Sequence, residues 1–302
     1  MPGEILNTEA GSAFVKHGHS SNIQREFDCL DYFARHRDQS RTRLAPGVIA
    51  RPDDRTLYIE PLIGWTSLHT VFEEQCEQGN SAAIDLGRAL ARTHAVPLPD
   101  FGASREYIPR LVVTPADLAS LPGELPRMLS FLHAANDFDA ALAEIRSRTY
   151  TPCFVHGDAK LDNVLVSPTG EVCLVDWEFG GIGDPAWDLG AAMGDFILRW
   201  IVSARVAPAT PLHSWLEGAT ISRDYAAALA ASIVDGYRQQ SEDTPSADRI
   251  AECVGVFLIH RAMAWIELYG RFTAKPMLLC YFGQRFVLRS ALALSAFLGR
   301  HV

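Results

Sequence analysis

No segment of the sequence is long and apolar enough to cross a membrane. The longest apolar stretches, such as Val254 to Ile259, are far shorter than the roughly 20 residues of a transmembrane helix. The residues from Met1 to Ala13 also lack the basic start and the apolar run of a secretory signal peptide. We therefore expect a cytoplasmic protein that has no membrane partner.

Positive charge is also scarce. The chain has 27 Lys and Arg residues against 36 Asp and Glu residues, which gives a formal net charge of −9. Nucleic-acid-binding domains usually have an excess of basic residues or basic clusters, and neither is present. We expect no nucleic-acid partner, and the acidic balance slightly favours a cationic substrate over a phosphorylated one.

Paired cysteines are absent as well. None of the six cysteines belongs to a Cys-x-x-Cys motif, so the sequence predicts neither a zinc site nor a disulfide framework. Free thiols of this kind suit a reducing compartment such as the cytosol. The cysteines are Cys29, Cys76, Cys153, Cys173, Cys253 and Cys280.

The strongest functional signal is an Asp, an Asn and a second Asp at fixed spacings. The run HGDAKLDN contains His156, Asp158 and Asn163, and Asp176 opens the later run DWE. Asp158 can accept the proton of an incoming hydroxyl group. The side-chain oxygens of Asn163 and Asp176 suit Mg²⁺, which prefers hard oxygen ligands. The pattern predicts phosphoryl transfer to a hydroxyl group.

Short apolar strands surround these residues. Residues 152–156 read as a strand that leads into the motif, and residues 163–167 and 172–176 read as a hairpin. Because a hairpin places the start of one strand beside the end of the other, we expect Asn163 to lie next to Asp176. The alternative is a surface hairpin whose acidic residues only cap turns.

On these residues the chain resembles the aminoglycoside phosphotransferase family, which includes the choline-kinase-like small-molecule kinases. That family writes its catalytic loop as His-Gly-Asp-x4-Asn and commonly has Asp-Trp-Glu at the second motif, and this chain has both. The run GDPAWDLG (183–190) also matches the family. The resemblance implies that His156 and Asp188 brace the catalytic loop. It is densest over residues 150–195 and weaker over residues 10–95.

The resemblance also implies a nucleotide site upstream of the motif. In the family, a strand lysine holds the α- and β-phosphates and a glutamate on the next helix orients it; Lys16 and Glu26 fit these roles. Backbone groups of a hinge between two lobes usually hold the adenine, which by position are the carbonyl of Glu60 and the amide of Leu62. GTP stays open beside ATP. The alternative is a solvated lysine and an acidic residue favoured by the helix dipole.

Periodicity and resemblance together predict an α+β, two-lobed protein-kinase-like fold. The chain has 302 residues, 48% of them hydrophobic, which is enough for a substantial core. We expect an abbreviated N-terminal nucleotide-binding lobe with the hinge over residues 1–64, and a mostly helical catalytic and substrate-binding lobe over residues 65–302. The expected strands upstream of the motif are 4–8, 13–16, 47–50 and 56–60, and the expected helices are 22–37, 80–95, 125–148, 189–204, 224–240, 249–272 and 286–298, with a loop or short insertion over 98–124.

Several side chains of these helices have predicted places. Asn80 or Ser81 is expected to cap the helix over 80–95, and His94 at its end is expected to be a core histidine rather than a catalytic one. The C-terminal helices usually build the acceptor site in the family. The predicted inner face of the first helix contains Phe27, Leu30, Phe33 and Ala34. The candidates for a cationic acceptor are Glu252, Glu267 and Tyr269, although a solvated helix face is the preferred interpretation of each.

One feature of the family is missing. Its phosphate-covering loop lies between the first two strands, but no Gly-x-Gly-x-x-Gly precedes Lys16, where Gly3 and Gly11 are isolated. We expect an N-terminal lobe that is abbreviated at this start site, or one that a protein or peptide partner completes. In either case more of the phosphate charge falls on Lys16 and magnesium.

These observations predict a kinase that uses ATP and Mg²⁺ to phosphorylate a hydroxyl group of a small molecule, such as an aminoglycoside-like or amino-alcohol compound. Asp158 is the expected base, and Asn163 and Asp176 are the expected metal ligands. Two alternatives stay open. One is a kinase that phosphorylates Ser or Thr of a peptide within a maturation complex, and the other is a nucleotide-binding pseudokinase or scaffold.

Overall fold

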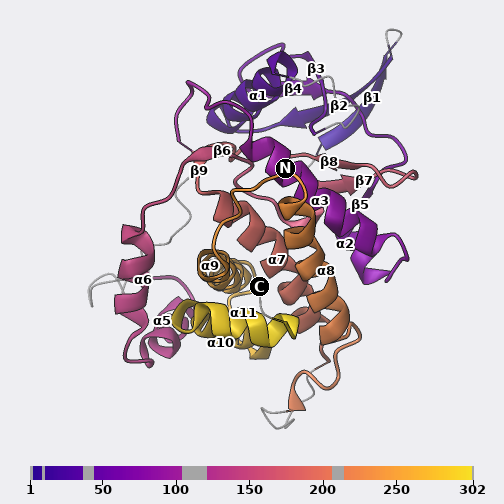
Figure 1. Cartoon of the computed structure of the whole chain (residues 1–302). Helices are drawn as coiled ribbons and strands as arrows, with labels where there is room; N and C mark the ends of the chain where they lie inside the picture. The colour runs from indigo at the N-terminus through magenta and orange to yellow at the C-terminus, as the bar shows by residue number, and fades with distance from the viewer. Residues whose placement is uncertain (1–2, 9–10, 37–43, 104–120, 206–213, 301–302) are drawn as a thin grey trace. The chain divides into compact units, whose positions relative to one another are not determined.

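A computed structural model describes residues 3–8, 11–36, 44–103, 121–205 and 214–300. Figure 1 draws its helices and strands, coloured by residue number. Contacts divide the chain into two compact units, each built from separate stretches of sequence. The predicted lobe boundary at residue 64 divides the chain by expected function, whereas the two units are defined by contacts. That boundary therefore stays a prediction. Unit 1 comprises Met1–Arg105, Thr151–Asp188 and Ser232–Thr244, and unit 2 comprises Glu106–Tyr150, Leu189–Ala231 and Pro245–Val302.

A four-stranded antiparallel sheet begins unit 1, and its second strand carries Lys16. The strand order is β1-β2-β4-β3, which confirms the two predicted hairpins. Because side chains alternate along a strand, Val15 is buried on one face of β2, while Phe14 and Lys16 line a cavity on the other. The strands are β1 (Gly3–Thr8), β2 (Gly11–His17), β3 (Val48–Ala50) and β4 (Thr56–Ile59).

Helix α1 (Ser20–Arg35) follows the first hairpin and buries a face that contains a charged residue. The prediction of its inner face was half right: Leu30 and Phe33 are buried, whereas Ala34 is exposed and Phe27 only half-buried. Apolar spacing alone misplaced the face because Glu26 occupies one of its fully buried positions. The buried residues are Ile23, Glu26, Cys29, Leu30, Tyr32 and Phe33.

The predicted hairpin around the HGDAKLDN motif is confirmed. Strands β7 and β8 pair antiparallel, with Val164 opposite Leu174, and β5 joins them as a third strand. The strand that leads into the motif belongs to a different sheet, where β6 pairs with β9, a strand that we did not predict. The elements are β5 (Thr66–Ser67), β6 (Cys153–Val155), the 3₁₀ turn η1 (Leu161–Asn163), β7 (Val164–Val166), β8 (Val172–Leu174) and β9 (Gly181–Gly183).

Helices α2 (Leu68–Glu73) and α3 (Gly79–His94) complete the early part of unit 1. The predicted cap of α3 was wrong. The N-cap residue is Gln78, which makes no side-chain cap, and the Asn80 side chain instead accepts a hydrogen bond from the Ser232 hydroxyl at 2.7 Å. A tertiary partner therefore took the side chain that local pattern assigned to the cap.

Unit 2 is helical, and its first predicted helix is two helices. Helix α5 (Leu125–His133) ends before α6 (Phe138–Ser147) begins. The residues between them include Asn136 and Asp137, whose side chains compete with helical backbone bonds and favour turns. The predicted loop over 98–124 falls largely on residues 104–120, outside the described residues.

The last helices are α9 (Ala247–Tyr269), α10 (Ala274–Leu288) and α11 (Ser290–Leu298). Sequence periodicity missed most of α10, because Leu278, Leu279 and Cys280 are buried in succession and leave no polar stripe. Glycines bring α9 and α10 together: a Cβ atom at Gly255 would lie only 2.7 Å from the backbone oxygen of Gly283. The pair forms the centre of unit 2.

Helices α7 (Pro185–Ser203) and α8 (Arg223–Arg238) each run from one unit into the other along the chain. Helix α7 begins four residues earlier than predicted. Pro185 suits the first helical position, and the Asp184 side chain accepts a hydrogen bond from the Ala186 amide at 2.9 Å, as an N-cap does. This start places Asp188 in the first turn.

None of the described helices has both the length and the apolar character that crossing a bilayer requires. All six cysteines are free thiols, as expected, and those on the strands near the motif are buried or half-buried.

Candidate functional site

Lys16 lies between two carboxylates that come from different elements of unit 1. Its Nζ atom is 2.5 Å from Oε2 of Glu26 on α1 and 2.5 Å from Oδ1 of Asp176, which follows β8. Asp176 adopts a φ of 67°, in the left-handed region that non-glycine residues rarely adopt. The structure thus brings together three residues that the sequence analysis selected at separate places.

The two carboxylates keep Lys16 protonated. Burial alone would lower the pKa of the Lys16 ammonium, but the charges of Glu26 and Asp176 outweigh burial and raise the pKa above its usual value. The contact also acts on Asp176: burial disfavours its charge, yet Lys16 holds the pKa of the carboxyl below its usual value. A positive and a negative charge therefore stay fixed side by side near neutral pH.

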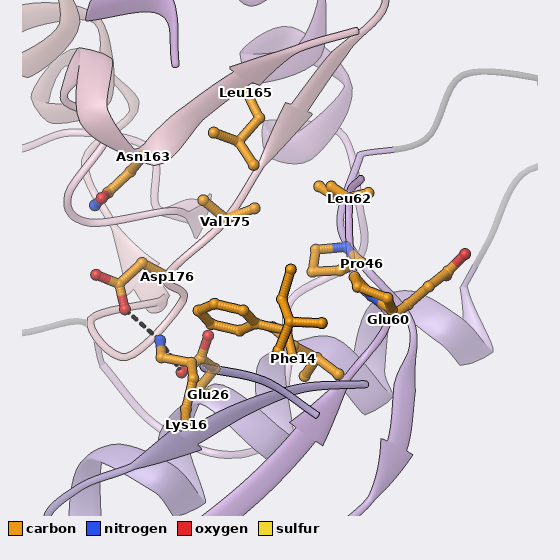
Figure 2. Close-up of a pocket in the computed structure, with 13 residues that line it drawn as sticks. Phe14, Lys16, Glu26, Pro46, Glu60, Leu62, Asn163, Leu165, Val175 and Asp176 are labelled. Carbon is orange, nitrogen blue, oxygen red and sulfur yellow. Dashed lines mark hydrogen bonds and ion pairs between the residues drawn. The ribbon is translucent and has the colours of Figure 1, made fainter. Parts of the chain in front are cut away.

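These charges lie at one end of a cavity of about 310 Å³ (Figure 2). In Figure 2, Asn163 joins Lys16 and Asp176 at this polar end, whereas Leu165 and Val175 lie along an apolar wall. Small-molecule sites typically measure about 300–1,000 Å³ and combine apolar walls with a few polar groups. The cavity suits a ligand that is apolar at one end and charged at the other. Its other lining residues are Ile5, Phe14, Glu26, Pro46, Ile59, Glu60, Pro61 and Leu62.

Asn163 connects this cavity to the catalytic motif. Its Nδ2 atom donates to the backbone oxygen of Asp158 and to Oδ2 of the same residue, each at 2.9 Å. The backbone oxygen of Asn163 accepts from the amide of Val175 at 2.9 Å, next to Asp176. The hairpin thus places Asn163 beside the Asp176 segment, as predicted. Because both side-chain hydrogen bonds are donated by Nδ2, Oδ1 of Asn163 can accept from or bind another group.

Asp158 is held from a second side by Lys160, a residue that the sequence analysis did not select. The Lys160 ammonium lies 2.5 Å from Oδ2 of Asp158. Burial raises the pKa of Asp158 above its usual value, and the charge of Lys160 offsets only part of that effect. The signal was present in the motif itself, because Lys160 is the only cation within the run HGDAKLDN.

His156 is fully buried and acts as a fixed part of the loop. Its Nδ1 accepts from the amide of Asp158 at 3.2 Å, so its proton lies on Nε2, which donates to the backbone oxygen of Val175 at 2.9 Å. Burial lowers the pKa of His156 below its usual value. Trp177 packs on the ring at 4.4 Å between centroids. Both ring nitrogens are therefore hydrogen-bonded to backbone groups on either side of the loop.

Asp188 holds the backbone of the same loop. Its side chain is fully buried, with Oδ2 accepting from the amide of His156 at 2.7 Å and Oδ1 accepting from the amide of Gly157 at 2.9 Å. Burial opposes its charge, yet hydrogen bonds from His94 and the backbone keep the pKa of Asp188 below its usual value. The carboxylate stays ionised and fixes two successive peptide groups.

The His94 side chain is only 4% exposed, which agrees with the predicted core position, and it has two specific partners. Its Nε2 atom lies 3.1 Å from Oδ2 of Asp188, and its Nδ1 lies 2.9 Å from the hydroxyl of Tyr237. No local sequence signal connects a histidine at the end of one helix with an aspartate in the first turn of another. Only the tertiary structure brings them together.

The predicted hinge residues line the cavity, and two backbone bonds involve them. The Glu60 amide donates to the oxygen of Gly47 at 2.8 Å, and the Leu62 oxygen accepts from the amide of Trp65 at 3.3 Å. Neither bond uses the Glu60 carbonyl or the Leu62 amide, the two groups assigned to the adenine. That assignment stays a prediction.

One candidate for acceptor binding has a different environment from either expectation. Glu252 is buried, not solvated, and its carboxylate pairs with Arg148 at 2.9 Å and with Arg249 at 3.1 Å. It ties the end of α6 to α9 within unit 2. Of the other two candidates, Tyr269 is 60% exposed, and Glu267 is exposed as well, so both lie on a solvated helix end.

Comparison with known proteins adds two findings. The family model described as the phosphotransferase enzyme family, APH, matches residues 5–229. A search of curated proteins finds no match.

Solved structures share the fold at low sequence identity. Choline kinase LicA from Streptococcus pneumoniae is 13% identical, with a TM-score of 0.55 over 95% of this chain and 89% of that chain. A structure of LicA in complex with AMP is also 13% identical, with a TM-score of 0.54 over 98% of this chain and 88% of that chain. The gentamicin–APH(2'')-IIa complex is 14% identical, with a TM-score of 0.52 over 97% of this chain and 89% of that chain. The likeness confirms the predicted kinase-like α+β fold.

Proposed function

The chain belongs to the phosphotransferase enzyme family and is a kinase that acts on a hydroxyl acceptor; on this premise we propose that it transfers the γ-phosphoryl group of Mg²⁺-bound ATP to a hydroxyl of a small molecule. The observation that carries the proposal is the position of Lys16. Its ammonium lies between Glu26 and Asp176, at the polar end of a cavity that Asn163 also lines. A buried lysine oriented by a glutamate is the arrangement that positions nucleotide phosphates in kinases.

The shape of the cavity supports a nucleotide. A purine base is flat and weakly polar, so it suits the wall formed by Leu165 and Val175, while the phosphates suit Lys16 at the other end. AMP in the LicA complex indicates that the same fold accepts an adenine nucleotide in a related enzyme. We propose ATP, with GTP as the alternative, and assign the base to the Glu60 carbonyl and the Leu62 amide.

The residues at the polar end fit a magnesium ion. Oδ1 of Asp176 faces Lys16, which leaves Oδ2, and the bonds of Asn163 use Nδ2, which leaves Oδ1. One carboxylate oxygen and one amide oxygen, completed by phosphate oxygens and water, make the hard ligand set that Mg²⁺ prefers. When bound, the ion neutralises phosphate charge and orients the transferred group.

The catalytic loop supplies the base. The acceptor oxygen forms a bond to the γ-phosphorus, the bond to the bridging oxygen of the leaving diphosphate breaks, and the acceptor proton passes to the carboxylate of Asp158. Lys160, 2.5 Å from that carboxylate, keeps it more ionised than burial alone would allow. Asn163 holds the same carboxylate in place. The products are the phosphorylated alcohol and ADP.

His156 and Asp188 keep this base where it is needed. Asp188 fixes the peptide groups just before Asp158, and His156 accepts the Asp158 amide. Neither residue contacts the reacting atoms in this scheme. Their contribution is positional, and an error of about 1 Å in the position of a reacting group can cost about 10²-fold in rate.

Nucleotide binding tests the first half of the proposal. The chain has three lysines, Lys16, Lys160 and Lys275, which allows a matched comparison. Lys16→Met should weaken Mg-ATP binding by about 10- to 100-fold, the value of a lost charge-assisted hydrogen bond. Lys275→Met should leave affinity unchanged, since Lys275 bonds the backbone oxygen of Val202 in unit 2. Equal affinity in Lys16→Met and wild type, by calorimetry, contradicts the assignment of the cavity.

An acceptor screen tests the second half. ADP release is measured with neutral alcohols, amino alcohols, aminoglycosides and Ser- or Thr-containing peptides. We expect turnover with a small-molecule alcohol, and slow turnover or none with peptides. Selective phosphorylation of peptides would replace the small-molecule acceptor with a peptide, and Mg-ATP binding without turnover on any acceptor would favour a pseudokinase.

A further inference from the structure

The buried Asp188 carboxylate has three donors, and one of them comes from outside the catalytic loop. The amides of His156 and Gly157 bind one oxygen each, and Nε2 of His94 shares Oδ2 at 3.1 Å. The His94 side chain is 4% exposed and that of Asp188 is fully buried, so water does not compete for these bonds. Their strength depends on protein groups alone.

The Asp188 carboxylate fixes the direction of one bond of His94: an ionised carboxylate only accepts, so Nε2 donates to Oδ2. In the neutral ring, Nδ1 is then the acceptor. The acceptor Nδ1 faces the hydroxyl of Tyr237 at 2.9 Å. Burial raises the pKa of Tyr237, so the hydroxyl keeps the proton that it donates. Hydrogen bonds therefore run without a break from Tyr237 through His94 to Asp188, and from Asp188 to the loop backbone.

The helices that carry His94 and Tyr237 touch backbone to backbone. A Cβ atom at Gly87 of α3 would lie 2.0 Å from a backbone oxygen of α8, and one at Gly236 would lie 2.0 Å from a backbone oxygen of α3. Two reciprocal glycines at this crossing let the helices approach more closely than any side chain would allow. Tyr237 follows Gly236 directly, so the close contact sets the position of its hydroxyl against His94.

We propose that His94 and Tyr237 are positioning residues for phosphoryl transfer: they orient Asp188, which in turn fixes the peptide groups that precede Asp158. The inference rests on the proposed function, because it assigns the orientation a role in turnover. It makes α8, far along the chain, a determinant of catalytic-loop geometry. Neither residue lines the cavity that we assign to the nucleotide.

Three variants test this role by kinetics. His94→Leu removes both bonds, and kcat should fall by about 10- to 100-fold, as for other residues that orient a functional group indirectly. Tyr237→Phe removes one donor and should cost about 3- to 10-fold. His94→Gln keeps a donor toward Asp188 and an acceptor toward Tyr237, and should recover most of the wild-type rate. The KM for ATP should stay within about threefold of wild type in all three.

Ser232→Ala is the matched control for helix packing. It removes the Ser232–Asn80 bond between the same two helices without touching Asp188. A fall in kcat equal to that of His94→Leu would reduce the proposal to helix packing. A raised KM for ATP with unchanged kcat would overturn it as well.

Amide hydrogen exchange gives a readout that needs no acceptor. In His94→Leu, the amides of His156 and Gly157 should lose protection, while the amide of Val175, bonded to Asn163, keeps it. His94→Gln should restore protection. If wild type shows no turnover but this pattern holds, the proposed function fails and the positioning of the loop stands. Unchanged protection in His94→Leu overturns the positioning role even in an active kinase.

Discussion

Asp176 and Asp188 are two aspartates of the same unit that are stabilised in opposite ways. Asp176 is 20% exposed, borders the cavity and is paired with the long side chain of Lys16. Asp188 is fully buried and is held by two backbone amides and His94. Both have a pKa below the usual value, but a side-chain ammonium lowers the pKa of Asp176, whereas His94 and the loop backbone lower that of Asp188.

This difference suggests separate roles: Asp176 in the proposed binding of the nucleotide, and Asp188 in fixing the geometry of the loop. A lysine can shift its hydrogen bonds from Asp176 to a phosphate, because its rotatable stem keeps the charge within reach. Backbone amides cannot leave Asp188 unless the loop itself moves. Substitutions at the cavity should therefore act mainly on nucleotide affinity, and substitutions around Asp188 and Asp158 mainly on turnover and stability.

The largest expected effect is on turnover. Asp158→Asn removes the proton acceptor but keeps the shape and a bond to Asn163, so the rate should fall by about 10²- to 10⁴-fold. Mg-ATP affinity should stay nearly unchanged, because Asp158 is not a lining residue of the cavity. Steady-state kinetics with calorimetry checks both values. Near-wild-type turnover in Asp158→Asn would remove Asp158 from the role of base.

The converse change is Asp176→Ala. It removes the only carboxylate in the proposed metal site and leaves Lys16 paired with Glu26 alone, so metal-dependent ATP affinity should fall by about 10- to 100-fold. Asn163→Ala should lower affinity less and turnover more, since Asn163 also holds Asp158. Calorimetry with and without Mg²⁺ gives the comparison. If Asp176→Ala keeps the full magnesium effect, the metal lies elsewhere.

Asp188→Asn should lower stability. An amide cannot accept all three donors, and the buried mismatch should cost about 3 kcal/mol in the free energy of unfolding. Because its folded pKa is lowered, ionised Asp188 stabilises the fold above the unfolded pKa, and this contribution disappears as pH falls through the folded pKa. Denaturant unfolding across acidic pH should show a smaller pH dependence in Asp188→Asn.

Asp224→Asn is the matched control for that experiment. The Asp224 side chain is 87% exposed and pairs only with a neighbouring arginine among the ion pairs of the described residues, so its change should stay within about 0.5 kcal/mol. An equal loss of stability in both variants would show that burial of Asp188 is not what matters.

The smallest expected effect is a shift in the pH profile. Burial raises the pKa of Asp158 and Lys160 partly offsets it, so Lys160→Met should raise that pKa further. The base must be ionised, and the acid limb of kcat/KM should therefore move to higher pH. Lys275→Met is the control and should leave the limb in place. A limb that stays fixed or moves to lower pH in Lys160→Met contradicts the coupling.

The sequence predicted best what local spacing controls. A hairpin joins neighbouring segments, so the contact between Asn163 and the Asp176 segment followed from the turn between them. Likewise, the strand of Lys16 and the helix of Glu26 were recognised from alternating and helical periodicity. Periodicity was a weaker guide where polar residues are buried or where helices are apolar on all sides. For this reason the predicted inner face of α1 was only half right and most of α10 was missed.

The sequence by itself therefore determined the kind of fold, the motif HGDAKLDN with DWE, and the set of acidic and amide groups that we propose for phosphoryl transfer. The tertiary structure alone decided which hydrogen-bond partners hold each of these groups in place. Asp188 meets His94, and His94 meets Tyr237, from three helices whose sequences contain no sign of one another. The physical reason is that burial removes water as a partner, so each buried polar group must find donors and acceptors wherever the packed chain happens to bring them.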